Sequence, residues 1–152
     1  MAVMLPSSGT DEGAMMVHRA AVGLPEALAR QVLQDMVPGS GEVLAEAVEE
    51  AAIQAALQNQ RDDPDYGRIA AGVLLQRIYR HATGTRTPSE HEYRTAFCCY
   101  IRSSVDRGLL DPRLLGFDLE TLAASLVPER DRLLDYLGLA TVADRYLVRD
   151  LD

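Results

Sequence analysis

Residues 61–84 read RDDPDYGRIAAGVLLQRIYRHATG and decide the fold class of this chain. Asp63 is suited to cap a helix, Pro64 to occupy its first turn and Asp65 to face its positive end. Gly84 is the expected stop, because glycine readily adopts the left-handed conformation that ends many helices. Between these signals the apolar spacing predicts one buried stripe on a central helix: Tyr66, Ile69 or Ala70, Val73, Leu74 and Ile78, with Arg68, Arg77 and Arg80 outside it.

The next segment, residues 87–108, reads TPSEHEYRTAFCCYIRSSVDRG and predicts a second long helix. Thr87 and Glu90 are three residues apart with Pro88 between them, which favours a reciprocal capping box. Gly108 is the expected stop. The spacing predicts a single buried face on this helix: Tyr93, Phe97, Tyr100, Ile101 and Val105.

Upstream of residue 61 we expect a flexible leader and three helices. Residues 1–13 mix Pro, Ser, Gly, Thr and acids without periodicity, which is typical of a leader. Helices are predicted from Met15 to Val22, from Pro25 to about Pro38, and over residues 42–60. On the last of these, the expected inner positions are Leu44, Val48, Ala51 or Ala52, and Ala55, and the expected outer positions are Glu46, Glu49, Glu50 and Gln54.

Downstream of residue 108 the sequence predicts four short helical pieces: DPRLL, FDLETLAASL, PERDRLLDYLG and LATVADRYLV. Pro112 and Pro128 suit first turns, Asp118 suits a cap, and Gly138 is expected to close the third piece. No segment alternates apolar and polar residues as a strand does. We therefore predict an all-α fold, an irregular array of about seven or eight helices with no sheet, in a single domain over residues 14–152.

Composition excludes several classes of partner. The chain has 152 residues, 47% hydrophobic and 25% charged, which is the composition of a globular domain. Its formal net charge is −8 and every basic side chain is Arg, so we expect no binding to nucleic acid. No apolar run reaches the roughly 20 residues that cross a bilayer, and the expected compartment is the cytoplasm.

Neither a metal centre nor a nucleotide-binding motif is predicted. His18, His81 and His91 are far apart, and a site built from His91 and Cys98 would lack the four ligands of a structural zinc. A phosphate-binding loop of the P-loop kind needs a Lys, which the chain does not contain. We expect no cofactor and no metal in this chain.

Three further groups invite a chemical role, but each is better explained structurally. Cys98 and Cys99 lack the spacing of a redox pair, so packing is favoured. Asp62, Asp63 and Asp65 lie at a predicted helix start, where negative charge is stabilising, so capping is favoured over acid–base chemistry. Four interleaved charges on a short helix predict a solvated, salt-bridged face: Glu129, Arg130, Asp131 and Arg132. No catalytic residue is therefore predicted.

Three stretches together resemble the helical domain that precedes the catalytic barrel in ribonucleotide reductase large subunits. They are RDDPDYGRIAAGVLLQRIYRHATG, AFCCYIRSSVDRGLLDPRLLGFDLETLAASLVPERD and LLDYLGLATVADRYLVRD, with a weaker likeness in VHRAAVGLPEALARQVL. The resemblance covers about residues 15–150. At residues 39–47, GSGEVLAEA departs from the Met-Thr-Thr type of turn that is common in the family.

The resemblance implies a structural role within a ribonucleoside-diphosphate reductase. Such enzymes reduce ribonucleotides to deoxyribonucleotides for DNA synthesis, and their radical-forming cysteine, cysteine pair, Glu and Asn lie in the barrel. Cys98 and Cys99 match none of these positions, and the resemblance implies that the ATP-binding regulatory cone of many members is missing. We expect this chain to be inactive alone, to bind the barrel in cis or as a separate chain, and to be capable of self-association.

Two rival functions remain open. A free-standing helical adaptor or regulator predicts a polar surface throughout, whereas a large apolar patch on residues 109–150 would favour the reductase interpretation. An independent nucleotide-binding module is the third possibility, and a flat calorimetric titration with ATP and dATP would remove it.

Overall fold

The computed structural model describes residues 8–36 and 45–147, and its regular structure there is entirely helical. Four helices make up the first half of the fold: α1 (Ser8–Ala20), α2 (Glu26–Asp35), α3 (Ala45–Asn59) and α4 (Asp65–Thr83). The second half consists of α5 (Glu90–Asp106), the 3-10 helix η1 (Pro112–Gly116), α6 (Leu119–Ala124), the 3-10 helix η2 (Pro128–Leu133) and α7 (Tyr136–Arg145). The predicted all-α class, without a strand in the described ranges, is confirmed.

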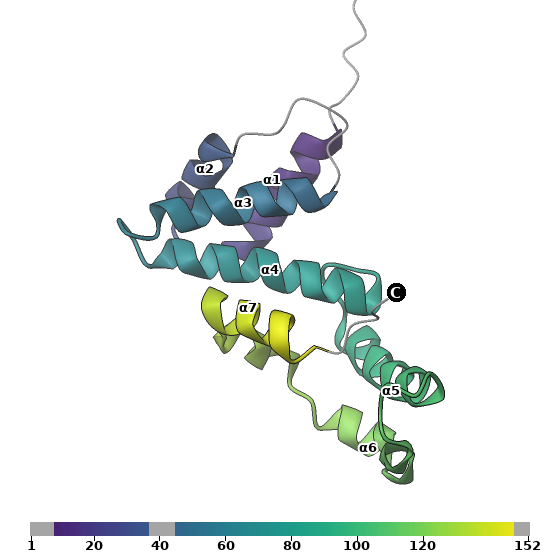
Figure 1. Cartoon of the computed structure of the whole chain (residues 1–152). Coiled ribbons are helices and arrows are strands. Elements are labelled where there is room, and N and C mark those ends of the chain that lie inside the picture. Colours follow the sequence, from purple (N-terminus) through teal and green to yellow (C-terminus); the bar gives the residue numbers. More distant parts are fainter. Residues whose placement is uncertain (1–7, 37–44, 148–152) are drawn as a thin grey trace, which may run out of the picture.

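Helix α4 is the centre of the molecule, as its sequence predicts. In Figure 1 it runs between α1–α3 on one side and α7 on the other, while α5 and α6 extend away from this bundle. Ile69, Ala70 and Val73 are completely buried. Burial extends beyond the predicted stripe to Ala71, Leu75 and Gln76, because neighbours cover α4 on several sides.

The main core joins α4 to each of its neighbours. Met16 and Val17 of α1, Val32 of α2 and Ile53 of α3 are almost inaccessible to solvent. Leu139 of α7 is 4% exposed and belongs to the same cluster. The first and last helices of the described chain are therefore held by one hydrophobic core.

Helices α1 and α4 are in close contact at Gly72. A Cβ atom at this position would lie 2.9 Å from both the Cα and the Cβ of Ala20. Such a distance is shorter than real Cβ contacts, so only glycine lets the two helices meet here without a shift. The small residue thus sets the distance between two core helices.

The start of α1 differs from the prediction. The helix begins at Ser8 rather than Met15 and ends at Ala20, so residues 8–13 of the expected leader are helical. Asp11 and Glu12 are exposed whereas Gly13 is buried, so this part of the helix has a polar outer side that lacks a clear apolar pattern in the sequence. The remainder of the expected leader, the predicted turn at residues 39–41 and Leu44 lie outside the described residues.

The capping box of α5 is present, but two residues later than predicted. Ser89, not Thr87, is the N-cap: its Oγ accepts a hydrogen bond from the Glu92 backbone N–H at 3.3 Å. The Glu92 carboxylate in turn accepts from the Ser89 backbone N–H at 2.7 Å. Thr87 with Glu90 and Ser89 with Glu92 both fit the Ser/Thr-x-x-Glu pattern of a capping box. Serine is the stronger N-cap of the two hydroxyl residues.

The buried face of α5 is also rotated relative to the prediction. Cys98 and Ser104 are its buried residues, whereas Tyr100 is 45% exposed. The other four predicted core positions are only partly buried. The reason is that α5 packs mainly on η1 and α6. These helices are short and leave part of its apolar face uncovered.

Most predicted boundaries after residue 108 are confirmed. Gly108 is left-handed with a φ of 73°, Pro112 and Pro128 begin η1 and η2, and Asp118 caps α6 by accepting from the Thr121 N–H at 3.0 Å. The prediction for Gly138 is wrong. It lies inside α7, where its N–H donates to the Asp135 cap at 2.7 Å. Within the described ranges, no helix combines the length and apolarity needed to cross a membrane.

Candidate interaction surface

Large apolar side chains are exposed mainly in the C-terminal third of the chain. Among the described residues, 13 large hydrophobic side chains are exposed, and 10 of them fall between Leu109 and Leu147. We call these ten residues the C-terminal apolar set: Leu109, Leu115, Phe117, Leu122, Val127, Leu133, Leu134, Leu137, Tyr146 and Leu147. Single exposed apolar residues are normal on proteins, but such a concentration in one segment is typical of a protein interface.

Helix caps hold this segment in place although its side chains face outward. Asp111, Asp118 and Asp135 each accept a backbone N–H at the start of η1, α6 and α7. These bonds satisfy donors that would otherwise lack partners at helix starts. The local structure is therefore fixed by polar groups near the backbone, and Leu133 and Leu137, 77% and 73% exposed, need not be buried to form it.

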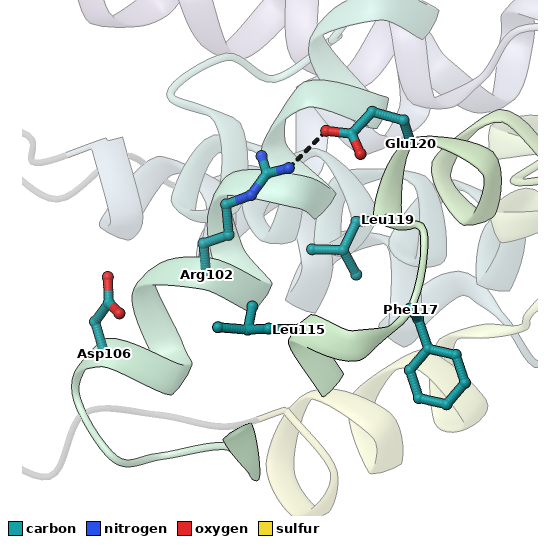
Figure 2. A pocket seen from close by; sticks show the side chains of 6 residues that line it. All are labelled: Arg102, Asp106, Leu115, Phe117, Leu119 and Glu120. Carbon is teal, nitrogen blue, oxygen red and sulfur yellow. Dashed lines mark hydrogen bonds and ion pairs between the residues drawn. The ribbon is translucent and has the colours of Figure 1, made fainter. Parts of the chain in front are cut away.

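A groove opens among α5, η1 and α6. It has a volume of about 490 Å³ and is lined by Leu115, Phe117 and Leu119 together with three charged residues, Arg102, Asp106 and Glu120. Figure 2 shows Phe117 pointing away from Arg102 and Asp106, with Leu115 and Leu119 lying between Phe117 and these two charged residues. Arg102 and Glu120 form an ion pair at 2.5 Å across one side of the groove. The groove thus combines an apolar floor with a charged edge, as many protein-binding surfaces do.

The core beneath this groove is small. It consists of Cys98, Leu119 and Ala123, with Phe97 and Ile101 packed against them. Cys98 is buried and its thiol donates to the Leu119 carbonyl oxygen at 3.5 Å, which confirms the packing role predicted for one of the two cysteines. Cys99 is exposed, and both thiols are free. The unit formed by α5, η1 and α6 is thus held together by few buried contacts of its own.

Glu49 is the most unexpected residue of the fold. It was predicted to face outward, but its side chain is completely buried and pairs with three arginines. Its two oxygens accept from Arg77 Nε at 3.0 Å and Arg80 Nε at 3.2 Å, and a further bond comes from Arg86. Burial alone would raise the pKa of Glu49, but the hydrogen bonds and charges of Arg86 and Arg80 outweigh this effect and lower it.

A half-buried cluster of polar side chains joins α4, α5 and η2. Tyr79 and Tyr93 each donate a hydroxyl hydrogen bond of 2.9 Å to the same oxygen, Oδ2 of Asp131. Their rings meet edge to face with centroids 5.9 Å apart. Burial and the Asp131 carboxylate raise the pKa of Tyr93 to about 12 and shift that of Tyr79 in the same direction. Asp131 therefore accepts hydrogen bonds that connect η2 to α4 and α5. The prediction that its side chain belongs to a solvated, salt-bridged face is wrong.

The remaining candidate residues do not come together in one site. His18, His81 and His91 are exposed on α1, α4 and α5. Asp63 accepts the Asp65 N–H at 2.9 Å and so satisfies an amide at the helix start, although the N-cap position of α4 is Pro64 and not Asp63. Within the described ranges, no group of three or more His, Cys, Asp or Glu residues is arranged to hold a metal ion. Neither the buried Glu49 nor the half-buried Asp131 could be recognised from sequence patterns, because their partners come from distant segments.

The described residues define a class of protein: an all-helical domain whose C-terminal third exposes apolar side chains. Comparison with protein-family models finds no match. The chain is 34% identical over 139 residues to the ribonucleoside-diphosphate reductase subunit alpha of Chlamydia muridarum, covering 87% of this chain. It is 29% identical over 110 residues to the same subunit of Helicobacter pylori, covering 71% of this chain, and 29% identical over 93 residues to that of Enterobacteria phage T4, covering 59%.

The chain is a homologue of a small, N-terminal part of the ribonucleoside-diphosphate reductase alpha subunit. It spans 13% of the length of the Chlamydia muridarum relative and 13% of that of Helicobacter pylori. The resemblance stated from the sequence motifs is therefore confirmed.

Proposed function

We propose that this chain is the structural, helical N-terminal part of a ribonucleoside-diphosphate reductase large subunit. In this role it supports the catalytic barrel through the C-terminal apolar set. One observation carries the proposal: 10 of the 13 exposed large hydrophobic side chains in the described ranges lie between Leu109 and Leu147. The similarity to alpha subunits that are much longer than this chain supplies a partner for that surface.

The enzyme so formed would reduce ribonucleotides to deoxyribonucleotides for DNA synthesis in the cytoplasm. This chain would contribute packing, and the reacting cysteines would belong to the barrel. The chain alone is expected to show no reduction of nucleoside diphosphates, whereas the complex with the remainder of the subunit and a radical source is expected to turn over. Product formation measured with a labelled nucleoside diphosphate tests both statements.

The alternative function, a free-standing helical adaptor or regulator, receives less support. Such a protein is expected to present polar groups over its whole surface. Phe117, Leu133, Leu137 and Tyr146 are each at least 60% exposed, which is costly for a domain without a partner.

Association with the barrel is the direct test of the proposal. The full chain would be mixed with a polypeptide that contains the remainder of the large subunit, and binding would be measured by sedimentation velocity. We expect a stable complex at micromolar concentration. The double variant Phe117→Asp/Leu137→Asp is expected to weaken it by at least about tenfold, because buried aromatic and aliphatic anchors carry much of the energy of an interface.

Met15→Asp provides the matched control. Met15 is 52% exposed on α1, far along the chain from the C-terminal apolar set, so its replacement adds the same charge to another exposed apolar position. We expect this variant to bind like the wild type. An absence of complex formation, or equal weakening by the control, would overturn the proposed function.

A further inference from the structure

A second cavity, distinct from the groove at α5, lies among α1, α4, α7, η2 and the connection from α4 to α5. Its volume is about 320 Å³. This size falls at the lower end of the range for small-molecule sites, about 300–1,000 Å³. Its wall brings together residues from both halves of the chain, including Arg19 of α1, Gln76 of α4 and Arg132 of η2.

Positive charge gathers at this cavity although the chain is acidic overall. Four arginines and one carboxylate, Glu129, contribute to the wall, while the whole chain has a net charge of −8. Arg68 and Arg86 are already paired, with Asp65 and with Glu49 and Glu12. Arg19 and Arg132 have no ion-pair partner among the described residues. Two guanidinium groups are thus free to hold an anion.

Gln76 is a buried polar residue in the wall of the cavity. The residue is 6% exposed, and its Nε2 donates to the carbonyl oxygens of Met16 at 3.0 Å and Gly72 at 3.3 Å. Its Oε1 is buried and receives no hydrogen bond from the described residues. This oxygen is enclosed by protein atoms, so Gln76 contributes to the wall without offering its acceptor to a ligand.

The rest of the wall is apolar or already satisfied. Leu75 and Leu139 are buried members of the main core that reach the cavity. Tyr79 and Tyr93 also line it, but their hydroxyl groups donate to Asp131, so their rings are what they can offer to a ligand. Such surfaces favour a flat apolar body next to a charged group.

We propose that this cavity binds a small organic anion. Its phosphate or carboxylate group is held by Arg19 and Arg132, and its apolar body packs beside Leu75, Leu139 and the tyrosine rings. Its lining residues and those of the groove at α5 do not overlap, and Leu134 is the one member of the C-terminal apolar set that takes part in its wall.

Two-dimensional NMR on the full ¹⁵N-labelled chain tests the proposal, with 4-aminophenyl phosphate and 4-aminobenzoate as probes. Each probe combines an anionic group with an aromatic ring. We expect saturable shifts for residues around the cavity and for the Gln76 side-chain amide with at least one of them. Inorganic phosphate and aniline, which each lack part of this combination, are expected to bind at least about tenfold more weakly.

The variant Arg19→Gln/Arg132→Gln is expected to weaken probe binding by at least about tenfold, since it removes both free guanidinium groups. Arg61→Gln/Arg130→Gln is the matched control: it makes the same change in net charge at two exposed arginines that do not line the cavity. This control should bind like the wild type. Equal losses in both variants, equal binding of inorganic phosphate, or no saturable shift at the cavity would overturn the proposal.

Discussion

At the scale of single residues, Glu49 shows how charge can organise a helical core. Its carboxylate connects α3 to two arginines of α4 and to Arg86 in the connection that follows. Arg86 also pairs with Glu12 of α1 at 3.1 Å. A single ionised group therefore joins three helices and a loop, and its removal would leave three partly buried guanidinium groups without their main partner.

We predict that Glu49→Gln lowers the free energy of unfolding by about 3 kcal/mol, the typical effect of breaking a buried ion pair. Glu50→Gln is the matched control: the neighbouring carboxylate is 52% exposed and pairs with Arg77, so its loss is expected to cost less than about 1 kcal/mol. Urea unfolding monitored by circular dichroism measures both values. Similar stability losses for the two variants would contradict the central role of Glu49.

The pH dependence of stability provides a separate prediction. The pKa of Glu49 is lowered in the folded protein, so its stabilising contribution is present above the unfolded pKa and is lost as pH falls through the folded pKa. Between about pH 6 and about pH 3, the wild type should therefore lose more stability than Glu49→Gln. Urea unfolding at several pH values measures the difference, and parallel curves for the two proteins would contradict the prediction.

Gly72 yields a prediction in which two effects oppose each other. Alanine at a helix interior gains about 1 kcal/mol over glycine, but here its Cβ would lie 2.9 Å from Ala20, and overpacking costs about 1–3 kcal/mol. Because the obstruction includes backbone atoms, we expect Gly72→Ala to be net destabilising in thermal unfolding. Gly116→Ala, where a Cβ meets nothing within 4 Å, should be neutral or stabilising.

At the scale of helices and turns, local signals were predicted best. Asp63 and Gly84 bound the central helix as expected, because capping and a left-handed turn depend on residues adjacent in sequence. Glu49 and Tyr100 were placed on the wrong sides of their helices, since burial depends on neighbours supplied by distant segments. The groove at α5 was not foreseen in detail for the same reason.

The capping box of α5 can be tested directly. Ser89→Ala removes the side chain that accepts the Glu92 N–H and should cost about 1 kcal/mol of unfolding free energy. Thr87→Ala, at the position first predicted from the sequence, should change stability by less than about 0.5 kcal/mol. Chemical denaturation of the two variants compares the positions, and the reverse order of effects would restore the original assignment.

At the scale of the whole molecule, the buried residues are divided unevenly between two hydrophobic cores. The main core includes residues of α1, α2, α3, α4 and α7, whereas the second core has three buried residues in the described part of the chain: Cys98, Leu119 and Ala123. Local stability follows the density of buried contacts. The region that carries the groove is therefore the part whose structure has the most to gain from a partner.

Hydrogen exchange should reveal this division. Amide protons of α4 are expected to exchange slowest, whereas those of α5 and α6 should exchange at lower opening free energies. Addition of the remainder of the large subunit should slow exchange in α5 and α6 more than in α4. Uniform protection across the chain would contradict the division, and a lack of change on mixing would count against docking at this surface.

The contrast between the adjacent thiols has a practical consequence. Cys98 is buried and bonded to a carbonyl oxygen, while Cys99 is exposed on α5. Alkylating reagents therefore have one accessible target in the native chain, next to the unit with the least internal packing. A maleimide fluorophore at that sulfur would follow association by anisotropy without an engineered labelling position.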